Sequence, residues 1–171
     1  MKKILTASLL VLLLVPGTAF AVKLSPKDQN EIIGFKSAVA GMDTTQKIMY
    51  YNNQQKGLAV PLLLNFFLGC GIGSFAEGDN EGGLIGLAGE LSSVSVYILG
   101  AANGNPDTAL MGIIGLLAFR LYEIFRPISY TNEYNRQLSQ ALGVSSVQFA
   151  MTPAITQEGA TGLSMGAKLT F

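Results

Sequence analysis

Two charged side chains, Glu90 and Arg120, each lie inside an otherwise apolar stretch of the sequence, which makes them the first candidates for polar chemistry. A charge buried in a membrane costs roughly 3 kcal/mol or more, so such a residue tends to face an opposite charge or water. In one interpretation the two residues line a pore or a polar cavity. In the other they form a structural ion pair or lie near helix ends.

The composition argues against catalysis and against a bound metal or cofactor. The chain has no His and one Cys, so it can build neither an ordinary zinc site nor a Ser-His-Asp or Cys-His arrangement. Cys70 lies in an apolar segment and is interpreted as a small hydrophobic residue. Eleven basic residues balance eleven acidic ones, which offers no basic face to nucleic acid. We therefore expect neither an enzyme nor a nucleic-acid-binding protein.

The same composition is typical of a membrane-associated chain. Charged residues make up 13% of the 171 residues, about half of the ~25% that is usual for soluble domains. Apolar residues reach 49%, and the mean hydropathy is +0.40. Membrane lipid is therefore an expected partner.

The first 21 residues have the pattern of a secretory signal. Lys2 and Lys3 precede the apolar run 4–15, and Ala19-Phe20-Ala21 supplies a small-x-small cleavage pattern. The apolar run is too short for a membrane span, which needs about 20 residues. We expect cleavage near Ala21 and export of the mature chain.

The apolar residues fall into two arms around an acidic, glycine-rich turn. Residues 58–75 and 84–102 are nearly uncharged, and the turn 76–83 separates them, so the pattern predicts two helices folded back as a hairpin. Residues 109–119 are short enough to be a core helix or a re-entrant segment. Pro127 is expected to break or restart the helix. The predicted parts are a signal peptide (1–21), an amphipathic helical segment (22–56), the hairpin plus a third short helix (57–126), and a polar helix with a C-terminal β-hairpin (127–171).

Small residues at helical spacing suggest how the hairpin packs. Glycines three or four residues apart let two backbones approach closely in lipid. A dinucleotide loop is rejected, because it would need a preceding strand within a βαβ unit. The glycines could equally serve only to make the turn. The candidate packing and hairpin residues are Gly69, Gly71, Gly73, Gly78, Asp79, Gly82 and Gly86.

The end of the chain changes from helical period to strict alternation. Apolar residues occupy every second position over 163–171, and a looser alternation over 147–151 precedes a turn, so we predict a C-terminal β-hairpin. The last residue, Phe171, with Leu169 before it, resembles the sorting signal that bacterial assembly machinery reads in outer-membrane β-proteins. One hairpin cannot close a barrel, which takes about eight strands. The predicted fold class is mainly α: a glycine-rich membrane helical hairpin with flanking amphipathic helices and a C-terminal β-hairpin.

The segment 68–79, LGCGIGSFAEGD, followed by Gly82-Gly83 and an apolar helix, carries a resemblance to a known family. Together with the signal pattern and the terminal Phe171, it resembles the spirochaetal thirteen-kilodalton surface porin family of the Lyme spirochaetes. The hairpin is also similar to small two-transmembrane-helix domains. Cys70 stands where a bulkier apolar residue is expected. The resemblance implies an integral outer-membrane protein with channel activity and helical membrane segments.

Three functions follow for comparison. The first is a small outer-membrane protein that forms or supports a channel, as a homo-oligomer. The second is a non-conducting envelope protein whose hairpin packs in a membrane and binds a partner. The third, an inner-membrane hairpin, would place the acidic turn 76–83 in the cytoplasm, against the positive-inside tendency.

Overall fold

The computed structural model describes residues 22–155 and 161–170, and from residue 146 onward it describes the backbone alone. The chain divides into two compact units, which are described separately. Among the described residues, the hairpin unit contains 22–23 and 58–129. The polar unit contains 24–57, 130–155 and 161–170. The predicted signal peptide, 1–21, lies outside the described residues.

The polar unit begins with two capped helices, α2 (Pro26–Ala38) and α3 (Thr44–Gln54). The side chain of Ser25 accepts a hydrogen bond from the backbone N–H of Asp28, as expected for a residue that caps a helix. At the start of α3, Asp43 and Gln46 form a reciprocal capping box. Two helices with these caps thus lie within the segment 22–56, which the sequence predicts to be helical.

A cluster of polar and aromatic side chains holds this segment against the C-terminal part of α7 (Pro106–Leu142). The ammonium group of Lys56 lies 2.8 Å from the carboxylate of Asp28 and over the rings of Tyr130 and Tyr134. The hydroxyl of Tyr130 donates to the same carboxylate. The Asn135 amide exchanges two hydrogen bonds with the backbone of Lys56. Contacts between residues far apart in the sequence therefore hold the polar unit together.

Two strands follow α7. β1 (Ser146–Ile155) and β2 (Thr161–Thr170) pair antiparallel, with Val147 opposite Leu169. Leu169 is thus placed within β2, whereas Phe171 lies outside the described residues. No side chain of either strand is described, so the predicted half-buried hairpin, with an apolar and a polar face, is not shown.

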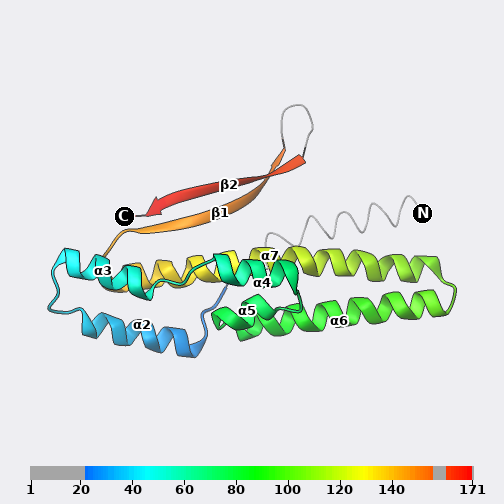
Figure 1. The fold of residues 1–171 in the computed structure, drawn as a ribbon, viewed down its shortest axis with the longest axis horizontal. Helices are drawn as coiled ribbons and strands as arrows, with labels where there is room; N and C mark the ends of the chain where they lie inside the picture. Colours follow the sequence, from blue (N-terminus) through cyan, green and yellow to red (C-terminus); the bar gives the residue numbers. More distant parts are fainter. Residues whose placement is uncertain (1–21, 156–160, 171) are drawn as a thin grey trace. The chain divides into compact units, whose positions relative to one another are not determined.

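The hairpin unit contains α4 (Ala59–Phe67), α5 (Ile72–Glu77), α6 (Asn80–Ala102) and the first part of α7. Helices α6 and α7 run antiparallel, side by side, and residues 103–105 connect them (Figure 1). A Cβ on Gly100 would collide with the backbone of Ala109, and one on Gly112 with the backbone of Tyr97. α6 and α7 therefore pack backbone against backbone.

The predicted fold class is correct in being mainly α, but the predicted helical hairpin pairs the wrong segments. The predicted first arm, 58–75, is two short helices with a break at 68–71, so the long antiparallel pair is α6 with α7. The segment 109–119 belongs to α7 and is not a separate short helix. The break arises because Gly69, Cys70 and Gly71 all have positive φ angles.

The predicted helix break at Pro127 is also wrong. Helix α7 continues through Pro127 for 37 residues, because other groups satisfy the backbone there, as described below. The boundary between the two units lies between Ser129 and Tyr130, within this helix. Arg120, Glu123 and Arg126 follow one another at intervals of three residues, a spacing that lets charges pair along one face of a helix. Of these three residues, Arg120 and Glu123 contact each other within α7, at 3.9 Å, whereas Arg126 pairs with Asp79, the residue that caps α6.

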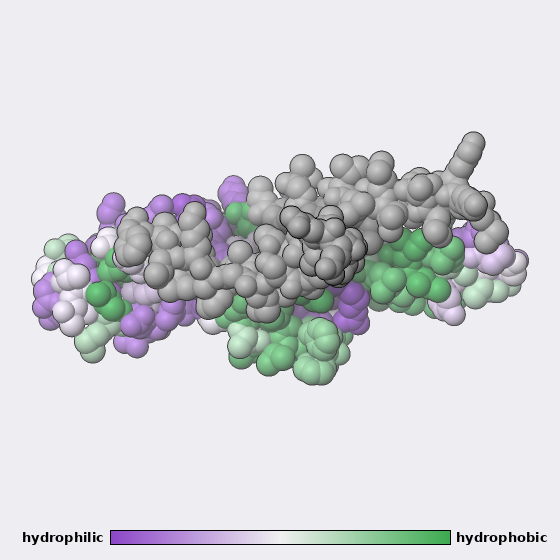
Figure 2. Space-filling view, turned by 90° about the horizontal axis from the view of Figure 1, so that it is seen from above, coloured by the Kyte–Doolittle hydropathy of each residue, from purple (hydrophilic) through white to green (hydrophobic). Residues whose placement is uncertain are grey.

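The hairpin unit has polar residues inside and apolar residues outside. Its buried side chains include Asn65, Glu90, Glu123 and Arg126, whereas Leu, Ile, Val and Phe side chains of α4 to α7 are exposed. Figure 2 shows such apolar surface as green patches. Among the described residues, two helices, α6 and α7, are long and apolar enough to cross a membrane. This distribution is the reverse of that in a water-soluble core.

Candidate functional site

The candidate site is a buried polar cluster in the hairpin unit, at the break between α4 and α5. Helix α4 contributes Asn65, α6 contributes Glu90, and α7 contributes Arg120 and Glu123. The loop 69–71 lies among them. The side chains of Glu90 and Glu123 are 6% and 1% exposed, so both carboxylates are removed from solvent.

The loop directs its backbone N–H groups at the two carboxylates. The φ angles of Gly69, Cys70 and Gly71 are 68°, 53° and 67°. Successive backbone N–H groups in a turn can form a concavity that suits anions. The N–H of Cys70 donates to Glu90 Oε2 at 2.9 Å, and that of Gly71 donates to Glu123 Oε1 at 2.5 Å. The Cys70 thiol contacts the same Glu90 oxygen at 3.2 Å.

Arg120 joins the carboxylates to α4. Its Nε lies 2.7 Å from Glu90 Oε1, and its Nη1 lies 3.9 Å from Glu123 Oε2. Nη1 also donates to the backbone carbonyl of Asn65 at 3.2 Å. The guanidinium packs where a Cβ on Gly69 would be. The Arg120 side chain is 42% exposed, so it alone of the three charges reaches the surface of the unit.

Asn65 compensates for the proline in α7. Because Pro127 has no N–H, the carbonyl of Glu123, four residues earlier, loses its helical donor. The Asn65 amide donates to that carbonyl at 2.8 Å. Its Oδ1 accepts from the N–H of Gly73 at 2.6 Å, and its Nδ2 lies 3.3 Å from Ser74 Oγ. One side chain of α4 thereby satisfies the backbone of both α5 and α7.

A second ion pair lies at the N-terminus of α6. Asp79 caps α6 by accepting from the N–H of Gly82, and its carboxylate receives two hydrogen bonds from Arg126, at 2.5 and 3.0 Å. The side chains of Asp79 and Arg126 are 2% and 5% exposed. Glu81, which is 69% exposed, lies 4.0 Å from the same guanidinium. A bidentate Arg–carboxylate pair of this kind fixes orientation as well as charge.

The structure places the predicted glycines at close contacts rather than only at a turn. A Cβ on Gly71 would collide with the Gly83 backbone, and a Cβ on Gly73 with the Pro61 carbonyl. Gly69 and Gly78 have positive φ angles, and Gly78 ends α5. Gly82 and Gly86 make room for polar side chains, namely Asp79 with Arg126 and Glu123. Each of these glycines is thus required by its surroundings.

Of the predicted charges, Glu90 and Arg120 are brought together, whereas Leu169 lies in the polar unit. Asn65 and Glu123 of the cluster, and Arg126 of the second ion pair, were not chosen as candidate site residues from the sequence. Asn65 had a local signal, since it is the polar residue of an otherwise apolar helix. Glu123 precedes Pro127 by four residues, but nothing in the sequence tells which side chain meets its carbonyl.

The cluster can hold charge inside apolar surroundings. Both carboxylates accept from the loop, so they neutralise its N–H dipoles and the charge of Arg120 together. No group of three or more His, Cys, Asp or Glu residues that could hold a metal ion occurs in the part of the chain that the structure describes. The half-exposed guanidinium is the group through which the cluster can meet water or an anion.

Comparison with known proteins gives one family. The family model described as Borrelia membrane protein P13 matches residues 48–168, a range that includes all of the hairpin unit from α4 onward. No curated protein and no solved structure matches the chain. The match covers well over half of the sequence, and the apolar exterior of α6 and α7 agrees with a membrane location. The chain therefore belongs to the Borrelia membrane protein P13 family and is a membrane protein.

Proposed function

We propose that this protein forms or supports a channel in the outer membrane, as an oligomer of several copies. The observation that carries the proposal is the position of Arg120. Its side chain is 42% exposed, and Leu117 and Leu121, on either side of it along α7, are 59% and 41% exposed. Placing the Arg120 guanidinium against hydrocarbon would be costly. This cost favours an assembly in which the guanidinium faces water.

A channel of this kind would run between copies. Within one hairpin, the glycine contacts of α6 and α7 bring the two backbones together and leave no room for a conduction path. Several copies that turn Arg120 toward a common axis would give a ring of cationic groups, each supported by Glu90. Rings of charged side chains are one of the ways in which channels select ions.

The outer membrane is proposed from the sequence. The signal pattern of residues 1–21 supports export, and the terminal Phe171, with Leu169, supports recognition by outer-membrane assembly machinery. Deletion of Phe171 should lower recovery in the outer-membrane fraction while signal cleavage continues. Equal recovery of the full-length and shortened chains would contradict this part of the proposal.

Planar-bilayer recordings of the purified mature protein test the channel. Arg120→Gln removes the cation that faces the path, so the ratio of anion to cation permeability should fall. Glu90→Gln removes the carboxylate that neutralises Arg120, so the same ratio should rise. Glu31→Gln, which lies in α2 and outside the hairpin unit, is the matched control and should leave the reversal potential unchanged. Identical reversal potentials for all four proteins would exclude a path along the cluster.

The alternative is a non-conducting membrane protein that packs or binds partners through its helical hairpin. The observation in its favour is that Glu90 is already engaged by Arg120 and by the N–H and thiol of Cys70. A wild-type protein that inserts and folds in the bilayer but conducts no ions would support this alternative.

A further inference from the structure

We infer that α4, the loop 68–71 and α5 form a re-entrant element: they dip into the lipid from one end of the α6–α7 hairpin and return to that same end. The partner of their outer face is then the acyl chains of lipid. This inference rests on the membrane location of the family and does not require that the protein conducts ions.

The first argument is that the backbone N–H groups of the loop find hydrogen-bond acceptors within the protein, without water. Irregular backbone is tolerated at membrane depth only where protein or a water-filled cavity meets its polar groups. Six consecutive N–H groups, from Leu68 in the loop to Gly73 in α5, all donate to protein acceptors. Their acceptors are Leu64 O for Leu68, Asn65 O for Gly69, Glu90 Oε2 for Cys70, Glu123 Oε1 for Gly71, Gly69 O for Ile72 and Asn65 Oδ1 for Gly73.

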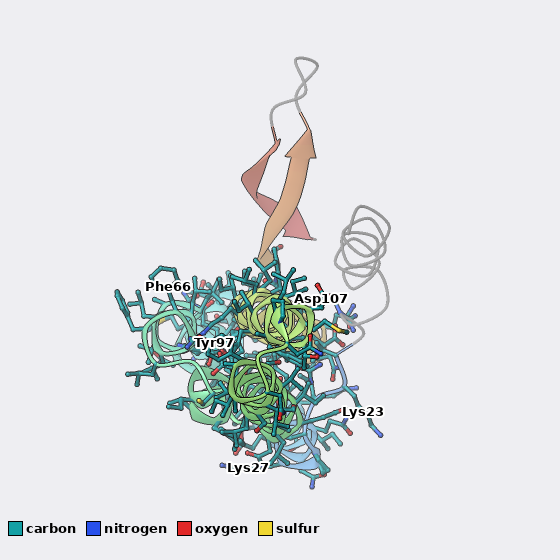
Figure 3. The ribbon with its side chains drawn as sticks, turned by 90° about the vertical axis from the view of Figure 1, so that its right-hand side faces the viewer. Lys23, Lys27, Phe66, Tyr97 and Asp107 are labelled. Atoms are coloured by element: carbon teal, nitrogen blue, oxygen red, sulfur yellow. The ribbon has the colours of Figure 1, made fainter. Side chains whose placement is uncertain are left out.

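The second argument is that the outer face of this element is apolar. Phe66 is 62% exposed and Phe67 is 72% exposed, next to the loop. Figure 3 shows Phe66 at the outer edge of the helices. The other large exposed apolar residues of the element are Val60, Leu63, Leu68, Ile72 and Phe75. Helices α6 and α7 also expose large apolar side chains, among them Leu91 and Leu117, so one lipid environment can serve all four helices.

The third argument is the position of the polar ends of α6 and α7. At about 1.5 Å per residue, Arg126 lies about 30 Å along α7 from its first residue, Pro106. This equals the hydrocarbon thickness of about 30 Å. The asparagines of the connection 103–105 thus mark one boundary, and the buried Asp79–Arg126 pair marks the other.

The fourth argument is that α4 is too short to span and long enough to reach the cluster. Its nine residues give about 13 Å. The loop binds Glu90, which lies about 16 Å along α6 from Asp79, and Glu123, which precedes Arg126 on α7 by less than one turn. The loop therefore reaches into the hydrocarbon between the levels of Glu123 and Glu90, and α5 leads the chain back to Gly78 and Asp79.

Tryptophan fluorescence tests this path, because the chain has no Trp of its own. Phe66→Trp is placed on the proposed lipid face. Leu91→Trp lies on α6 next to Glu90 and is 57% exposed, so it is the control at matched depth. Ile33→Trp, 68% exposed on α2, is the control outside the hairpin unit. Each variant is reconstituted in phosphatidylcholine vesicles with bromine atoms at defined acyl positions, and iodide serves as the aqueous quencher.

The Phe66→Trp and Leu91→Trp proteins should be quenched most by the same bromine positions, and iodide should quench both several-fold less than the Ile33→Trp protein. If iodide quenches the Phe66→Trp protein as strongly as the Ile33→Trp protein, and bromine does not quench it, the element lies in water and the inference fails. Leu63→Trp, 54% exposed on α4, repeats the test if the first variant does not fold. A protein that shows lipid quenching but no conductance would keep the re-entrant element and refute the channel.

Discussion

Replacing Asn65 by Leu should destabilise the hairpin unit strongly, and replacing Pro127 by Ala should partly relieve that loss. The Asn65 amide is 1% exposed and serves two backbone groups that have no solvent contact, the carbonyl of Glu123 and the N–H of Gly73. Leucine has a similar volume but offers neither a donor nor an acceptor, so Asn65→Leu leaves both groups buried and unpaired.

The magnitude follows from the cost of such groups. Each unsatisfied buried group costs about 1–3 kcal/mol, so Asn65→Leu should lower the free energy of unfolding by about 2–6 kcal/mol. Pro127→Ala restores an N–H that can donate to the carbonyl of Glu123 along the helix. In that background only the Gly73 N–H loses its partner, so the cost of Asn65→Leu should fall by about 1–3 kcal/mol.

Equilibrium unfolding in mixed micelles, followed by circular dichroism, measures the four proteins of this cycle. Asn53→Leu is the matched control, because Asn53 lies on an exposed side of α3 and should change stability by less than about 0.5 kcal/mol. If Asn65→Leu costs the same with Pro127 and with Ala at position 127, the carbonyl is not what the amide satisfies, and the reasoning is refuted.

Three further predictions concern the same unit. Gly73→Leu should lower the free energy of unfolding by about 3 kcal/mol or more, because the new side chain would collide with the backbone carbonyl of Pro61 in α4. Gly34 lies in open space on α2, so the control variant Gly34→Leu should not be destabilised. Equal melting temperatures for the two variants would refute the close contact. Arg126→Met should lower the free energy of unfolding by about 3–5 kcal/mol, because it leaves the buried carboxylate of Asp79 unpaired. Arg136→Met breaks a partly exposed pair and should lower it by less than about 1 kcal/mol. Chemical denaturation of the two variants measures this difference. Hydrogen exchange in micelles should show slow amides at Cys70 and Gly71 although they lie in a loop, and rapid exchange there would mean that the carboxylates do not hold them.

The sequence predicted the apolar segments and gave close approach as one of two roles for the glycines, because both depend on local spacing. Glycine is the residue that lets backbones touch, and its repetition along α6 shows in the sequence whatever the partner is. The partner of that face could not be predicted. Gly89 packs on the Phe119 ring and Gly112 packs on the Tyr97 backbone, which are contacts between segments whose pairing no periodicity reveals.

The error in the predicted helical hairpin has a physical origin in two residues of α7, Arg120 and Pro127. The short apolar run 109–119 stops before Arg120, and Pro127 was expected to break or restart the helix, which is sound for an isolated helix. In the protein, Glu90 compensates the first and Asn65 compensates the second, and both come from other helices. A residue that breaks a helix on its own can be accommodated when a distant side chain supplies the missing partner, and this pairing is tertiary.

The closure of the loop 69–71 also constrains the order in which the chain can enter a bilayer. Its two carboxylate acceptors come from α6 and from α7, and Glu123 is the later of them to be synthesised. Until α7 is in place, the N–H of Gly71 has no carboxylate to receive it, so hydrocarbon would be a poor solvent for an insertion intermediate that consists of α4 to α6. Insertion is therefore favoured as one concerted event of the four helices, and a nascent chain that ends before Glu123 should be rejected by lipid and remain available to chaperones.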